Sequence, residues 1–271
     1  MNQDFYLQEK EGVVTLKCKP FEEISFLRHG FSTKHGGVSQ GEYASMNFST
    51  AKESQEIVDE NYRRFCAANG LPLESLALTQ QTHTTCIKEA GADLIGNGRT
   101  VVDQDVDGLV TAEMGLGLVC FTADCVPILL VEPKARVIAA VHSGWRGTVG
   151  GIGKNAVERM IALGADPRER LAAIGPSIGP CSFEVGPEVQ AEFTAAFGDR
   201  LPSVPSVREG HTMVDLWTAN RLVLADAGLK NEHIFTAEVC TLCHHDLYYS
   251  HRYTNGRRGS LIGTIAMEDA K

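Results

Sequence analysis

Residues 118–148 constrain the fold more than any other stretch, because two apolar runs each lead into side chains that can bind a metal. The first run, 118–131, is interrupted only at residues 122–125 and at Pro127. The second run, 137–141, is followed directly by His142. Short apolar runs bounded by turn residues are typical of strands buried on both faces. We therefore predict two core strands joined by a hairpin at residues 132–136.

Such a hairpin would bring Cys125, in the first run, close to His142, at the end of the second. A thiolate beside an imidazole suits a nucleophile with its base. The same pair suits two ligands of a zinc ion. A third interpretation is a plain core thiol, since cysteine is among the most buried residue types. The two residues alone leave these alternatives open.

Charge and composition exclude some classes of partner. The chain has 271 residues with 34 acidic and 25 basic side chains, for a formal net charge of -9. Attraction to nucleic acid needs a basic surface, so we do not expect nucleic acid as the main partner. The first residues lack the basic and apolar parts of a secretory signal, and no apolar run reaches about 18 residues. We expect a cytoplasmic protein without a membrane partner, whose eight cysteines are thiols rather than disulfides.

The rest of the chain contains periodic segments separated by turn residues, and it shows no repeats, low-complexity segments or clear linkers. A chain of this length can form one or two domains, and we favour one domain over residues 1–271. Apolar spacing predicts helices at 53–69, 150–163, 187–197 and 216–227, and strands at 13–16, 76–79, 171–174 and 234–239.

Several other polar residues invite a functional interpretation. His83 follows a predicted strand, although taken alone it is most simply a loop histidine. Asp103, Asp105 and Asp107 alternate, but the glycine and glutamate spacing of a calcium loop is missing, so we predict that they line a solvated turn.

The remaining cysteines of interest lie in two later loops. Cys240 and Cys243 have the spacing of half a zinc site, but no second pair of this kind occurs in the chain. We therefore predict that they do not form a second metal site. Cys181, between turn-forming glycines and prolines, is expected to be packed rather than reactive.

Three arginines could bind a phosphate. Arg252 and Arg257 lie close together near the carboxyl end of the chain, and arginine suits two-point binding of phosphate, although a solvated tail is the plainer alternative. Arg146 precedes a glycine-rich helix start, where an anion would be favoured.

Eight motifs in order resemble those of the YfiH/YlmD family, also described as the laccase-domain, multicopper polyphenol oxidase or purine nucleoside phosphorylase family. They are HGFSTKHGGVS, QQTH, DGLVT, TADCVPILL, HSGWRGT, GPSIGPCSFEVG, DLWTANR and the terminal run from the paired cysteines through YYSHR to the last arginines. The resemblance covers about residues 25–265. It implies a single layered α/β domain similar to the catalytic domain of cytotoxic necrotizing factor.

The resemblance also implies one zinc ion bound by His83, Cys125 and His142. Three protein ligands leave a fourth position open for water or substrate, as in catalytic zinc sites. These three residues, with Asp124 to orient a ligand or move a proton, are the expected catalytic residues.

Family activities are phosphorolysis of adenosine, inosine and methylthioadenosine, deamination of adenosine, and oxidation of phenols with copper. The resemblance therefore implies a purine nucleoside and phosphate as partners, with no obligate protein partner, and Arg146, Arg252 and Arg257 as candidates for phosphate. Zinc lowers the pKa of bound water toward neutrality, which suits attack on an amino-bearing purine carbon.

Copper oxidation fits the sequence less well, because laccase chemistry uses several coppers held by many histidines. The nine histidines contain no His-x-His pair. Cu²⁺ in the zinc site would give weak oxidation as a side activity, and a metal-binding protein without enzymatic activity is a third hypothesis. Tyr62 is a departure from the family, whose members commonly have arginine there, so an anion contact at this position is not expected.

Overall fold

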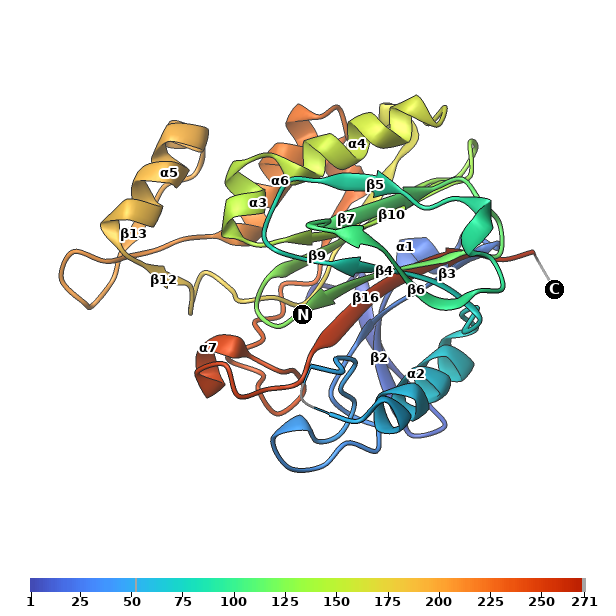
Figure 1. Cartoon of the computed structure of the whole chain (residues 1–271). Helices are drawn as coiled ribbons and strands as arrows, with labels where there is room; N and C mark the ends of the chain where they lie inside the picture. Colours follow the sequence, from blue (N-terminus) through green and yellow to red (C-terminus); the bar gives the residue numbers. More distant parts are fainter. Residues whose placement is uncertain (52, 270–271) are drawn as a thin grey trace.

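The computed structural model describes residues 1–51 and 53–269, in which two large β-sheets pack face to face and helices cover their outer faces (Figure 1). The chain therefore has a mixed α/β fold with several sheets, as expected. No helix in these two ranges is long and apolar enough to cross a membrane.

The first sheet has seven strands in the order β1-β2-β3-β16-β8-β4-β6. Its strands are β1 Phe5–Lys10, β2 Val13–Cys18, β3 Leu27–Ser32, β16 Leu261–Met267, β8 Gly117–Thr122, β4 Ser75–Gln80 and β6 Gly98–Gln104. Strand β4 runs parallel to both of its neighbours, and the other pairs are antiparallel.

The second sheet has six strands in the order β15-β11-β9-β10-β7-β5. They are β15 Ile234–Thr236, β11 Leu171–Ile174, β9 Val126–Glu132, β10 Val137–Ser143, β7 Gly108–Thr111 and β5 Ile87–Glu89. The predicted hairpin is present as β9 and β10, whose residues are all buried. Alternate side chains of β9 point to opposite faces: Leu129 packs between the two sheets, whereas Ile128 packs toward the helices.

Helices lie on both sides of the paired sheets (Figure 1). Four of them contribute to the core outside the six-stranded sheet: α3 Trp145–Val149, α4 Ile152–Ala162, α5 Pro187–Phe197 and α6 Leu216–Asp226. Helix α2, Gln55–Asn69, covers the seven-stranded sheet, and Gly70 ends it with a left-handed φ of 65°. Burial of these amphipathic faces is the main source of stability for such a layered fold.

Shorter elements complete the chain. Helices α1 Lys19–Glu22 and α7 His251–Thr254 each form a single turn, and the 3₁₀ helices are η1 Gly41–Tyr43, η2 Ala92–Leu94, η3 Pro167–Glu169, η4 Gly198–Arg200 and η5 Asn231–His233. A third, small sheet contains β12 Glu184–Val185, β14 Thr212–Met213 and β13 Val204–Pro205.

Three sequence predictions need correction. The run 118–131 is not one strand: β8 and β9 belong to different sheets, because the chain turns at Asp124, whose φ is 83°. The helix predicted at 150–163 is present as α4 but is shorter, because Gly150 ends α3 and Gly151 adopts a φ of 76° before α4 begins at Ile152. The strand predicted at 234–239 ends at Thr236, where its pairing with β11 ends.

Candidate metal centre

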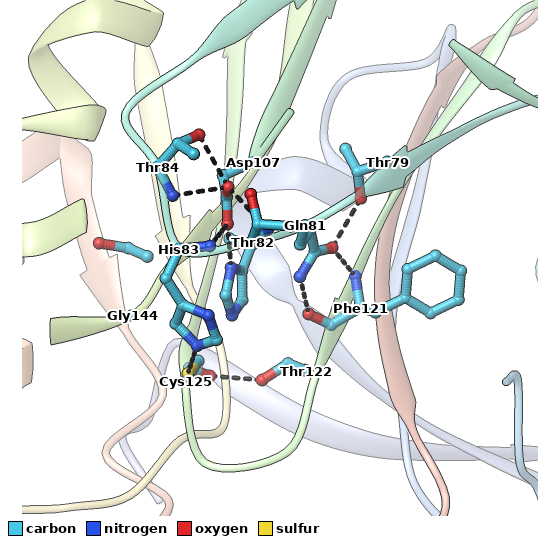
Figure 2. Close-up of polar contacts among 12 residues, drawn as sticks. Thr79, Gln81, Thr82, His83, Thr84, Asp107, Phe121, Thr122, Cys125 and Gly144 are labelled. Atoms are coloured by element: carbon cyan, nitrogen blue, oxygen red, sulfur yellow. Dashed lines mark hydrogen bonds and ion pairs between the residues drawn. The ribbon is translucent and has the colours of Figure 1, made fainter. Parts of the chain in front are cut away.

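His83, Cys125 and His142 come together where three parts of the fold end at one edge. His83 follows β4, Cys125 lies in the turn between β8 and β9, and His142 is near the end of β10. Their ligand atoms all lie within 4.8 Å of one another. The Sγ atom of Cys125 is 3.7 Å from Nε2 of His83 (Figure 2). The structure thus brings together the three predicted ligands, which lie far apart in sequence.

The β9–β10 register explains the position of Cys125. His142 pairs with Pro127 and Ser143 pairs with Val126, so the next residues outward are Gly144 and Cys125. A Cβ atom at Gly144 would lie 2.6 Å from Cδ2 of His83 and 3.4 Å from Sγ of Cys125. Gly144 therefore makes room for the imidazole beside the thiol (Figure 2).

Asp107 orients both histidines and was missed by the sequence analysis, which placed it in a solvated turn. Its side chain is fully buried. Its Oδ1 atom lies 2.7 Å from Nδ1 of His142 and accepts the backbone amide of His83 at 3.1 Å. Its Oδ2 atom accepts the Thr84 amide at 2.8 Å and the Thr84 hydroxyl at 2.9 Å (Figure 2). One carboxylate thus fixes the ring of His142 and the backbone of the other histidine.

Electrostatics favours the ligand form of the thiol. Burial acts to raise the pKa of Cys125, but the charge of His142 and hydrogen bonds from both histidines lower this pKa to about 6. Burial acts to lower the pKa of His142, but the Cys125 thiolate and Asp107 raise it to about 9. Burial likewise acts to raise the pKa of Asp107, and hydrogen bonds from His142 and Thr84 lower it to about 2. A thiolate, rather than a thiol, binds metal ions.

Asp124 holds the turn that carries Cys125. Its positive φ of 83° is uncommon for a residue other than glycine and needs support from its surroundings. That support comes from two hydrogen bonds: the Thr241 hydroxyl donates to Oδ1 at 2.6 Å, and the Arg252 amide donates to Oδ2 at 2.7 Å. Both carboxylate oxygens are therefore engaged in positioning the turn.

A cleft of about 480 Å³ opens beside His83, Cys125 and His142, and all three residues line it. Phe48, Phe121 and Leu78 supply apolar wall. Tyr62 is buried, with its ring 5.0 Å from that of Phe48. The Arg99 guanidinium lies 4.3 Å above the Tyr62 ring and forms an ion pair with Asp59, so a guanidinium is present at this wall although position 62 has none.

The cleft contains different arginines from those predicted. Among the residues that the structure describes, Arg99 and Arg258 are the arginines that line it. Arg146 lies over the Trp145 ring at 4.3 Å. Arg252 donates from Nη1 to the Glu184 carbonyl at 3.1 Å, and Arg257 is exposed.

Arg258 is half-buried, and burial lowers its pKa, although the charges of Asp124 and Cys125 oppose this effect. It donates from Nη1 to the Gly259 carbonyl and to the Ser260 hydroxyl. The arginine that lies near Cys125 in the cleft is therefore Arg258, one position after the predicted Arg257. Sequence offers no signal that separates these two neighbours.

The cysteines also require a correction. Cys181 is exposed rather than packed, and its Sγ atom lies 3.4 Å from that of Cys243. With Cys240 these residues form a second group whose sulfur atoms all lie within 4.8 Å. The Cys240/Cys243 pair therefore has a third thiol beside it that sequence spacing did not reveal.

The donor set and geometry fit a tetrahedral zinc ion at the first group. Zn–N of about 2.0 Å and Zn–S of about 2.3 Å separate the two donors by roughly 3.5 Å, and His83 Nε2 and Cys125 Sγ are 3.7 Å apart. The contact between Asp107 and Nδ1 of His142 leaves Nε2 of that ring as the other donor. Fold and site together define a layered α/β protein with three candidate metal ligands beside a cleft.

Comparisons with known proteins agree with this class. The family model described as multi-copper polyphenol oxidoreductase laccase matches residues 28–268. The chain belongs to this family, as its motifs predicted.

Three relatives illustrate the family. A Deinococcus radiodurans protein named purine nucleoside phosphorylase is 38% identical over 239 residues, which cover 88% of each chain. A protein named adenosine deaminase RL5, from an unknown prokaryotic organism, is 35% identical over 85% of this chain and 92% of its own. The crystal structure of YlmD from Geobacillus stearothermophilus superposes with a TM-score of 0.85 at 34% identity, covering 98% of this chain and 99% of that one. The chain is thus similar along most of its length to proteins named as enzymes of purine nucleosides.

Proposed function

We propose that this chain is a zinc-dependent purine nucleoside phosphorylase that acts on adenosine, inosine and methylthioadenosine and also deaminates adenosine. One observation carries the proposal: an open His-Cys-His centre stands at the end of a cleft with aromatic walls and two arginines. The names of the relatives support the same two reactions.

Zinc would be held by His83, Cys125 and His142, with Asp107 keeping Nε2 of His142 free for it. When bound, zinc supplies a Lewis acid and lowers the pKa of a water molecule in its open position. The protein contributes a rigid site: Asp107 fixes the imidazole of His142 and the backbone of His83, and Gly144 allows the His83 ring to lie close to the thiol.

In phosphorolysis, a phosphate oxygen attacks C1′ of the ribose while the bond from C1′ to the purine nitrogen breaks. The products are ribose 1-phosphate and the free base, which takes up a proton. We assign the base to the apolar wall that includes Phe48 and Phe121, since aromatic rings stack on purines. We assign phosphate to Arg258, because a guanidinium binds two phosphate oxygens at once.

Asp124 acts in this proposal as a positioning residue. Its two oxygens accept hydrogen bonds from Thr241 and Arg252, so it holds the Cys125 turn and is poorly placed to exchange a proton with substrate. In deamination, water adds to the amino-bearing purine carbon and ammonia leaves, with the base bound against the same wall.

The family description provides one observation in favour of a second activity, copper-dependent oxidation of phenols. Imidazole and thiolate ligands also bind copper, so Cu²⁺ in the same site would support a weak side reaction.

Metal replacement distinguishes these activities. Protein purified without added copper is stripped by a chelator, divided, and reloaded with Zn²⁺ or Cu²⁺. We expect nucleoside turnover from the zinc form and phenol oxidation, if any, only from the copper form. Nucleoside turnover that is equal in the stripped and zinc-loaded samples would exclude zinc dependence.

A further inference from the structure

The second group of thiols lies where two distant loops are joined. Strands β11 and β15 are parallel, so their carboxyl ends lie at the same edge of the sheet. The loop after β11 contains Cys181, and the loop after β15 contains Cys240 and Cys243. Backbone bonds connect the loops: Ser177 donates to the Val239 carbonyl at 3.2 Å. The convergence of the three thiols is therefore a product of sheet topology.

A hydroxyl group completes this cluster. The Oγ atom of Ser182 lies 3.5 Å from Sγ of Cys181, 3.5 Å from Sγ of Cys243 and 3.4 Å from Sγ of Cys240. The Cys181 and Cys243 sulfurs are 3.4 Å apart. The three sulfur atoms and the oxygen atom thus form a compact group of four atoms that could surround one metal ion.

These separations match a metal site better than a disulfide. Zn–S of about 2.3 Å and Zn–O of about 2.1 Å give edges of roughly 3.5 Å between sulfur and oxygen and roughly 3.8 Å between sulfurs. The three edges to the Ser182 oxygen agree with the first value. A disulfide requires about 2.05 Å between sulfurs, far less than the 3.4 Å between Cys181 and Cys243.

The polar environment favours a thiolate at the buried member of the cluster. Cys240 is 5% exposed, and its sulfur accepts the Gly179 amide at 3.2 Å. Amide groups directed at sulfur are the outer partners that stabilise metal-bound thiolates.

We propose that Cys181, Cys240 and Cys243, with the Ser182 hydroxyl in the fourth position, form a second and structural Zn²⁺ site. Three thiolates and a closed tetrahedral arrangement favour zinc. This proposal reverses the sequence prediction, and it is independent of the proposed enzymatic activity.

The ion would connect the two loops next to the first metal centre. Thr241, which follows Cys240, donates to the Asp124 carboxylate at 2.6 Å, and Asp124 precedes Cys125. A structural zinc would therefore stiffen the turn that holds the thiol ligand of the first site, and its binding free energy would add to the stability of the folded protein.

Zinc stoichiometry measured on chelator-stripped full-length protein tests the proposal. We expect wild type to take up two equivalents, and Cys243→Ser and Cys181→Ser each to take up one. Cys86→Ser, which removes a half-buried thiol outside both clusters, should still take up two. Circular dichroism checks that each variant is folded. Because Cys181 and Cys243 are exposed, we expect their replacement by serine not to disturb folding.

X-ray absorption identifies the ligands of the second ion. In Cys125→Ala, which lacks the thiol of the first site, the retained zinc should have three sulfur neighbours at about 2.3 Å. The two proposed sites can be disproved separately. If Cys125→Ala is the only variant that loses zinc, the second site is excluded and the first is retained. An unchanged two equivalents in both Cys243→Ser and Cys181→Ser would also overturn it, as would a Cys181–Cys243 disulfide detected by mass spectrometry in the protein as purified.

Discussion

The carboxylate of Asp107 lies 2.7 Å from Nδ1 of His142, and its other contacts hold the backbone of the loop that carries His83. Two ligands of the proposed zinc site therefore depend on one buried acid. Loss of such outer partners commonly weakens metal binding by about 10- to 100-fold.

We expect Asp107→Asn to weaken zinc binding at the first site by roughly that factor, because an amide cannot accept all of these hydrogen bonds. Competition with a chelator of known affinity measures the change. Asp103→Asn is the matched control, since Asp103 is an exposed acid paired with Lys88. Equal affinities of the two variants would show that Asp107 does not orient the ligands.

Gly144→Ala should weaken zinc binding without unfolding the protein. The added Cβ would lie 2.6 Å from the His83 ring, so that ring must move away from Cys125. Zinc titration with a thermal melt separates the two effects. Gly91→Ala is the control, because its Cβ would meet only the end of the Asp93 side chain. If Gly144→Ala binds zinc as tightly as wild type, the His83 ring can move aside without weakening zinc binding.

Arg258→Lys should reduce phosphorolysis more than deamination, because lysine keeps the charge but loses the planar fork that binds two phosphate oxygens. The expected change is a higher phosphate requirement, measured with adenosine at varied phosphate. Arg146→Lys in parallel tests the sequence assignment. A selective loss in Arg146→Lys with none in Arg258→Lys would return the phosphate site to the position predicted from sequence.

Thr241→Val should lower the free energy of unfolding by about 1–3 kcal/mol, because Oδ1 of the buried Asp124 carboxylate loses its 2.6 Å hydrogen bond while Oδ2 keeps the bond from the Arg252 amide. Urea denaturation measures this difference. Thr100→Val removes an exposed hydroxyl that bonds to the Asn97 carbonyl and should cost much less. Similar decreases in the free energy of unfolding of the two variants would mean that the Thr241 hydrogen bond contributes no more to stability than an exposed one.

Sequence was sufficient for features that depend on neighbouring residues. The β9–β10 hairpin follows from two apolar runs and a short connector, and helix α5 begins and ends at the predicted Pro187 and Phe197. The three residues of the candidate metal centre were named from sequence because each belongs to a family motif, and the structure brings them together. The end of α2 was also predictable, since Gly70 readily adopts the left-handed conformation.

Sequence was insufficient where function depends on pairing across the fold. Asp107 faces His142 because β7 pairs with β10, and its neighbours Asp103 and Asp105 are exposed. Cys181 meets Cys243 because β11 and β15 are adjacent in the sheet. Arg258 rather than Arg257 lines the cleft. The two residues lie in a segment without regular secondary structure, so sequence gives no pattern that predicts which of the two side chains faces the cleft.

The most direct test of the central claim is the formation of ribose 1-phosphate from inosine and phosphate. Inosine carries no amino group at the deamination position, so its turnover reports phosphorolysis alone. We expect phosphate-dependent release of hypoxanthine and ribose 1-phosphate by zinc-loaded wild type, and its loss in Cys125→Ala. No ribose 1-phosphate from the zinc-loaded wild type would exclude phosphorolysis of inosine, and undiminished formation by Cys125→Ala would exclude a role for the zinc site in it.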